Sequence, residues 1–86
     1  MLTHARIQAR QNLSEHEVLT LLNFELSAYE ECAGCHFTSV KLSGVVDDSG
    51  CNWRGADLQL GGAATEAAHK ITKQVVDEVR ETYNIA

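Results

Sequence analysis

Proline is absent from this 86-residue chain, and so are long apolar runs and any excess of positive charge. With no proline and no stretch rich in glycine and serine, nothing marks a linker, and the length suits one small domain spanning residues 1–86. No apolar run approaches the ~20 residues that a membrane-spanning helix needs. Residues 1–17 lack the apolar segment of a secretory signal, so we expect a cytoplasmic protein that makes no membrane contact.

The charge balance also limits which classes of partner are expected. Twelve acidic residues against seven basic ones give a net charge of −5. A protein that binds nucleic acid needs a basic stripe to displace counterions from phosphates, so this composition disfavours nucleic-acid partners. Three cysteines are an odd number, which in an expected reducing compartment argues against a disulfide framework.

The first third of the chain predicts a helix. Residues 1–12 alternate as in a strand, but their content of Ala, Arg and Gln favours a helix. Ser14 and Glu17 form a capping box, after which a helix is expected over about 15–31. Glu25 falls inside its apolar face, where it must either pair with Lys41 or Arg54 or lie at the margin. The apolar arc is too wide for one sheet to cover, so we favour the margin. The apolar face consists of Val18, Leu21, Leu22, Leu26 and Tyr29.

The middle third predicts a β-hairpin. Strands are expected over 36–46 and 51–60, joined by the turn DDSG at 47–50. If Val46 lies opposite Cys51, then Trp53 faces Gly44 and Gly55 faces Leu42. The apolar parity changes within the second strand, and a one-residue bulge near Gly55 would reconcile its two halves.

The last third predicts a second helix over about 63–83. Helix, hairpin and helix together give an α+β class: a two-layer sandwich with a short N-terminal leader and a two-stranded antiparallel sheet. The sheet has exposed edges, so a homodimer that pairs edge to edge can extend it to four strands. The buried stripe of the second helix comprises Ala64, Ala68, Ile71, Val75 and Val79.

Cys32, Cys35 and His36 form the pattern C-x-x-C-H, which has several readings. It is typical of haem attachment, but the only methionine is Met1 and no export signal is expected. Zinc needs four ligands, and these three residues with Cys51 make an incomplete set by known spacings. A redox dithiol is favoured by a helix N-terminus, whereas this pair follows a helix C-terminus in anionic surroundings.

The remaining reading of this segment is structural. Cys32 continues the apolar stripe of the first helix, Cys51 falls beside Trp53, and buried free cysteine behaves as a small hydrophobe. Gly34 then ends the helix, and Cys35 and His36 cross into the strand. We therefore predict a turn here and no cofactor, with zinc or haem as minority alternatives.

The chain contains no assembled catalytic set, and LGGAAT (60–65) lacks the lysine and the spacing of a phosphate-binding loop. We expect a small, soluble, acidic, non-enzymatic domain that acts by protein–protein contact or as a homodimer. Phe24 and Ala28, at the margin of the first helix, and the apolar hairpin face offer contact surface. The alternative is a metal-binding or thiol-redox protein centred on Cys32-Ala33-Gly34-Cys35-His36, with Cys32, Cys35 and His36 as ligands.

Overall fold

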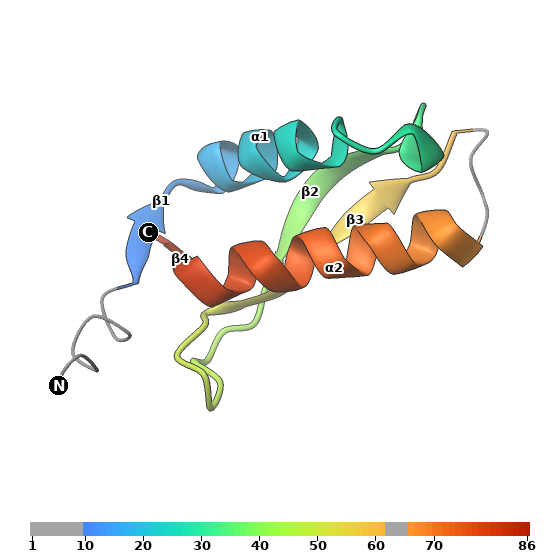
Figure 1. Cartoon of the computed structure of the whole chain (residues 1–86). Coiled ribbons are helices and arrows are strands. Elements are labelled where there is room, and N and C mark those ends of the chain that lie inside the picture. The colour runs from blue at the N-terminus through green and yellow to red at the C-terminus, as the bar shows by residue number, and fades with distance from the viewer. Residues whose placement is uncertain (1–9, 62–65) are drawn as a thin grey trace, which may run out of the picture.

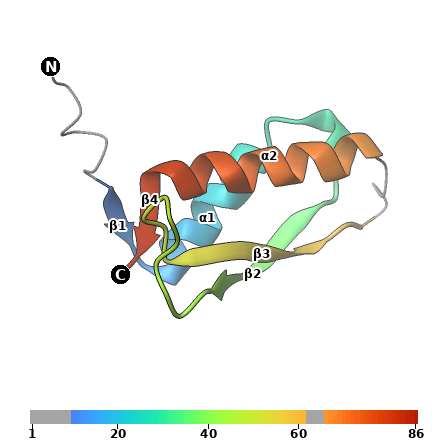
Figure 2. The same cartoon turned by 90° about the horizontal axis from the view of Figure 1, so that it is seen from below.

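Two helices lie side by side on one face of a β-hairpin in a computed structural model that describes residues 10–61 and 66–86 (Figure 1). The helices are α1 (Glu15–Leu26) and α2 (Glu66–Thr82), and the hairpin strands are β2 (His36–Leu42) and β3 (Trp53–Gln59). Viewed from below, both helices lie above the hairpin (Figure 2). The α+β class is confirmed.

The two ends of the described chain form a second sheet that the sequence analysis missed. Strands β1 (Gln11–Leu13) and β4 (Tyr83–Ile85) pair in parallel, with Leu13 opposite Ile85. The expectation of a single two-stranded sheet is therefore wrong, as is a helical leader at residues 11–12. A strand of three residues is too short to show a hydrophobic period, so the prediction depended on helix propensity alone, and that propensity was misleading. Residues 1–9 lie outside the described range.

Helix α1 begins as predicted and ends early. The capping box is confirmed: Ser14 Oγ accepts from the Glu17 N–H at 3.1 Å, and Glu17 Oε1 accepts from the Ser14 N–H at 2.9 Å. The helix stops at Leu26 instead of near 31, because Ser27 Oγ donates to the Phe24 carbonyl at 2.6 Å and Tyr29 is extended. A short 3₁₀ turn, η2 (Glu30–Cys32), follows. Glu25 is exposed, which confirms its place at the margin.

The hairpin is shorter than predicted. Leu42 faces Trp53 and Lys41 faces Gly55, so the proposed pairing of Leu42 with Gly55 is wrong. The strands end at Leu42 and resume at Trp53 because two glycines of the loop, Gly44 and Gly50, have positive φ angles of 77° and 90°. Arg54 is the extra residue beside Gly55, which confirms the predicted bulge there.

Trp53 lies at the centre of the core with no exposed surface, and its indole Nε1 donates to the Tyr83 carbonyl at 2.9 Å. Helix α2 starts at Glu66, and its predicted stripe is mostly confirmed: Ala68, Val75 and Val79 are buried and Ile71 is half-buried. Ala64 lies outside the described residues. None of the described helices combines the length and the apolar character that crossing a membrane requires. The buried apolar residues are Val18, Leu22, Leu26, Cys32, Phe37, Cys51, Trp53, Ala68, Val75, Val79 and Ile85.

Candidate functional site

The C-x-x-C-H segment runs from the end of η2 to the start of β2, and the predicted turn is present. Gly34 does not end the first helix, as was expected, because α1 ends at Leu26 and Gly34 follows η2. The Cys35 N–H donates to the Cys32 carbonyl at 2.8 Å, and Gly34 has a φ of 86°, which few residues other than glycine adopt. Cys32 is buried at the end of η2, Cys35 is half-buried, and His36 is exposed at the start of β2.

The turn brings the thiols of Cys32 and Cys35 together, and both have hydrogen-bond acceptors suited to the protonated form. Cys32 Sγ lies 3.9 Å from the Ala68 carbonyl, and Cys35 Sγ lies 3.3 Å from the Leu60 carbonyl. Burial, together with the neighbouring Cys35 and Glu31, raises the pKa of Cys32 above its ordinary value of 9.0. Cys32 is therefore a thiol, and a weak nucleophile, at neutral pH.

The third cysteine does not join this pair. Cys51 is buried just before β3, beside the C-terminal end of β2, whereas Cys35 lies next to the N-terminal end of β2. Its Sγ lies 3.2 Å from the Trp53 carbonyl. Over residues 10–61 and 66–86, no three His, Cys, Asp or Glu side chains are grouped so that they could hold a metal ion. Cys32, Cys35 and His36 are thus neighbours in sequence, and only the two thiols approach one another.

A cavity of about 480 Å³ opens beside this turn, and its walls include Tyr29, Cys35 and His36. Both cysteines of the pair line this cavity, and Cys35, which is half-buried, is more exposed than the buried Cys32. Of the remaining histidines, His16 and His69 are exposed and His4 lies outside the described range, as do residues 62–65 of the LGGAAT segment.

The opposite end of the hairpin carries an apolar surface that the sequence analysis placed in a strand. Leu42, Val45 and Val46, here called the hairpin-end patch, are 51%, 71% and 63% exposed. A hollow of about 290 Å³ lies between this patch and the C-terminal residues Ile85 and Ala86. The sequence signal for the patch is the uncharged run LSGVV (42–46), which lies between Lys41 and Asp47.

The loop that carries the patch is held by one carboxylate. Asp47 Oδ1 accepts from the Ser49 N–H, the Ser49 hydroxyl and the Cys51 N–H at 2.9, 2.6 and 3.0 Å, and Oδ2 lies 2.5 Å from Arg80 Nη2. These hydrogen bonds, with a smaller contribution from Arg80, lower the pKa of Asp47 to about 2. At neutral pH the carboxylate therefore fixes the loop against α2.

Comparison of the chain with protein-family models, with curated proteins and with solved structures gives no match in any of the three.

Proposed function

We propose that this protein works by protein–protein contact, as a homodimer whose interface includes the hairpin-end patch. The observation that carries the proposal is the exposure of Leu42, Val45 and Val46 side by side at one end of the molecule. Soluble monomers expose single apolar residues freely, whereas a contiguous group next to a hollow is typical of an interaction surface. The patch contains no charge, so two copies can meet there without repulsion.

Strand β2, which adjoins the patch, also favours a second copy of this chain as the partner. In the described part of the chain, no hydrogen bond from outside the β2–β3 ladder reaches the backbone of residues 38–42 on β2. The only charged side chain on this stretch, Lys41, is already paired with Asp57 at 3.3 Å. Antiparallel pairing of β2 with β2 of a second copy would complete the backbone hydrogen bonds and give a four-stranded sheet.

Sedimentation equilibrium tests the proposal directly. We expect a dimer at ~100 µM, and we expect Val46→Asp to be monomeric because it places two carboxylates in an apolar interface. Val46 is mostly exposed, so this change should leave the fold intact, as a circular dichroism spectrum would verify.

Phe24→Asp is the matched control, because Phe24 is 71% exposed against 63% for Val46 but lies on α1, away from the hairpin end. We expect this variant to remain a dimer. A wild-type protein that is strictly monomeric at ~100 µM contradicts the proposal. If the dimer is lost in the Phe24 variant and kept in the Val46 variant, the interface lies on α1 and not at the hairpin-end patch.

A second candidate function is thiol chemistry or metal binding at Cys32 and Cys35. The adjacency of the two thiols beside a cavity favours it, whereas the raised pKa of Cys32 opposes it. Metal analysis of the purified protein and the pH dependence of its reaction with an alkylating reagent test this function. Less than about a tenth of an equivalent of metal, with no thiol reacting faster than a free cysteine, would exclude this function.

A further inference from the structure

The second free edge of the hairpin, on β3, differs from the first. Strand β3 pairs only with β2, and over the described residues no hydrogen bond from outside the hairpin reaches the backbone of residues 54–58. The nearest such bond is at Trp53, whose carbonyl accepts from Arg80 Nε at 2.8 Å. Beyond that point the outer N–H and C=O groups of β3 have no partner, and a strand in this state is a template for another strand.

Helix α2 runs beside this edge and closes it into a groove. The space between β3 and α2 has a volume of about 440 Å³. The half-buried side chains of Ala56, Leu58 and Val76 supply its apolar surface. At Gly55 a side chain would meet nothing within 4 Å, so the groove is open at that position. An edge strand next to a helix, with a groove between them that is apolar in part, is the geometry in which extended peptides add to a sheet.

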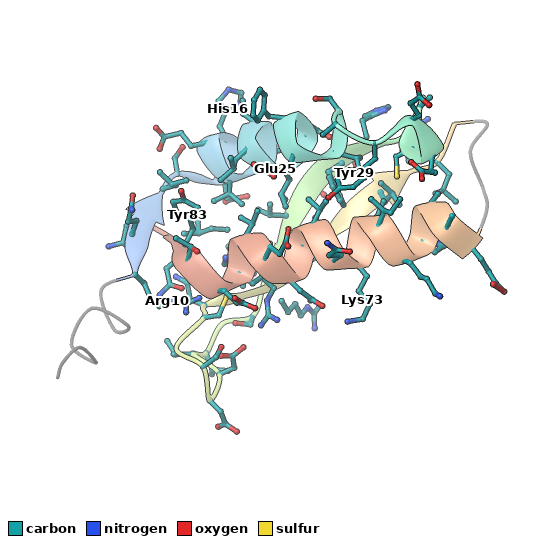
Figure 3. The ribbon with its side chains drawn as sticks, in the orientation of Figure 1. Arg10, His16, Glu25, Tyr29, Lys73 and Tyr83 are labelled. Atoms are coloured by element: carbon teal, nitrogen blue, oxygen red, sulfur yellow. The ribbon has the colours of Figure 1, made fainter. Side chains whose placement is uncertain are left out.

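The charges that line the groove are mostly positive, in a protein whose net charge is −5. Arg54, Lys73 and Arg80 line it together with one acid, Asp77. Lys73 lies 2.8 Å from Asp77, and Arg80 is paired with Asp47. Arg54 is exposed and has no ion pair in the described structure. Figure 3 shows Lys73 on the side of α2 that faces away from α1.

We propose that the groove between β3 and α2 binds an extended acidic segment of another protein, which adds to β3 as a further strand and places a carboxylate against Arg54. A second copy of this chain suits the groove poorly, because pairing β3 with itself would bring a second set of the same three cations to it. The inference rests on β3 and α2, and it holds whether or not the hairpin-end patch forms a dimer.

The probe is a synthetic peptide of alternating valine and glutamate, with an otherwise identical peptide of valine and lysine as the control. Binding is measured by fluorescence anisotropy and located by backbone amide NMR shifts. We expect saturable binding of the acidic peptide, weaker at high salt, with the largest shifts at residues 54–58 and 72–80. We expect the lysine peptide to bind at least tenfold more weakly.

Two kinds of variant separate strand addition from simple charge attraction. Arg54→Glu should weaken binding of the acidic peptide about tenfold. If that variant unfolds, Lys73→Glu reverses a charge on the other side of the groove, on α2, and serves the same purpose. Acidic peptides that are N-methylated at alternate positions keep every charge but lose backbone donors. Of the two alternate patterns, we expect one to abolish binding, since only one set of N–H groups faces β3.

Three outcomes would overturn the inference: no saturable binding up to ~1 mM, equal binding of both N-methylated peptides and the parent, or shifts confined to the hairpin-end patch. Because the dimer test uses Val46→Asp and this test uses Arg54→Glu, failure of either proposal is distinguishable from failure of the other.

Discussion

Asn23 and Asn52 each bind the backbone of another element through both atoms of the side-chain amide. Asn23 donates to the Phe37 carbonyl at 3.0 Å and accepts from the Phe37 N–H at 2.7 Å. Asn52 does the same to Ile85, at 2.7 and 2.9 Å. Each amide therefore takes the place of one residue of a neighbouring strand, Asn23 at β2 and Asn52 at β4. No periodicity reveals such a role, which is why the sequence analysis did not single out either residue.

Replacing Asn23 with Asp tests this role because the change keeps the size and removes the donor. The carboxylate would face the Phe37 carbonyl, and the free energy of unfolding should fall by about 2 kcal/mol at pH 7. Urea denaturation measures the loss. Asn12→Asp is the control, since Asn12 is exposed and its side chain makes no hydrogen bond within the described structure. Equal losses in the two variants would contradict the assigned role.

Gly61 differs from Gly44, Gly50 and Gly55 in how closely another backbone segment approaches it. A Cβ at Gly61 would lie 2.5 Å from the Gly34 carbonyl oxygen, and the φ angle of Gly61 is 59°. At Gly44, φ is 77°, but nothing lies within 4 Å of such a Cβ. The two sites therefore separate the cost of a left-handed backbone from the cost of a steric clash.

We expect Gly44→Ala to lower the free energy of unfolding by about 1 kcal/mol, the cost of the backbone conformation alone. Gly61→Ala should cost about 3 kcal/mol or more, because the Gly34 segment must also move. Urea denaturation of both variants measures the difference. Similar losses would show that the cysteine turn and residue 61 are not held as closely as the 2.5 Å approach requires.

The carboxylate of Asp47 links the stability of the loop to pH. Its folded pKa of about 2 is below its ordinary value of 3.8, so the stabilisation is complete above pH ~5 and is lost as the pH falls towards 2. Asp57 and Glu17 also have lowered pKa values, so the wild type alone cannot isolate this contribution. We expect the stability difference between wild type and Asp47→Asn to shrink between pH 5 and 2. A stability difference between these two proteins that does not change with pH would contradict the role assigned to the Asp47 carboxylate.

At the level of elements, the sequence predicted what depends on local chemistry. The capping box of α1, the bulge beside Gly55 and the apolar stripe of α2 follow from residue type and period. The early end of α1 and the short hairpin depend on competing local bonds, from Ser27 to Phe24 and from Asp47 to its loop.

The terminal sheet could not have been predicted in this way. Strands β1 and β4 have three residues each and are separated by most of the chain, and their pairing depends on contacts that only the folded molecule provides. The candidate sites divide similarly. The two cysteines of the turn were visible in the sequence. The hairpin-end patch was not, because β2 ends at Leu42 and not at the predicted residue 46. The β3–α2 groove depends on how α2 packs beside β3, which the periodicity of each element alone does not give.

At the scale of the whole molecule, the side chain of Arg10 joins the end of α2 and strand β4 to the hairpin loop. Arg10 Nε donates to Asn84 Oδ1 at 3.0 Å, and Nη1 donates to the Ser49 and Glu81 carbonyls at 3.2 Å each. Asn84 in turn donates to the Gly50 carbonyl at 3.0 Å. Figure 3 shows Arg10 at the start of β1, beside the end of α2. Strands β1 and β4 and the loop are thus expected to open as one unit.

If β1, β4 and the loop open as one unit, the losses in unfolding free energy caused by removing the hydrogen bonds that hold this unit should not be additive. Arg10→Ala and Asn52→Ala each remove hydrogen bonds to this region and should cost about 2 kcal/mol alone. Once the first change has released β4, the second removes less stabilisation. The loss in unfolding free energy of the double variant should therefore be smaller than the sum of the two single losses by more than ~0.5 kcal/mol. Urea denaturation of the four proteins gives this coupling.

The control cycle combines Arg10→Ala with Asn23→Ala, because Asn23 holds β2 to α1 and has no bond to the terminal strands. These two losses should add to within ~0.5 kcal/mol. Amide hydrogen exchange adds a second reading: in Arg10→Ala, protection should fall at Ile85 and Cys51 together and stay unchanged at Phe37. Additive losses in both cycles would mean that Arg10 and Asn52 stabilise separate parts of the fold, and that the terminal sheet opens independently of the loop carrying the proposed dimer surface.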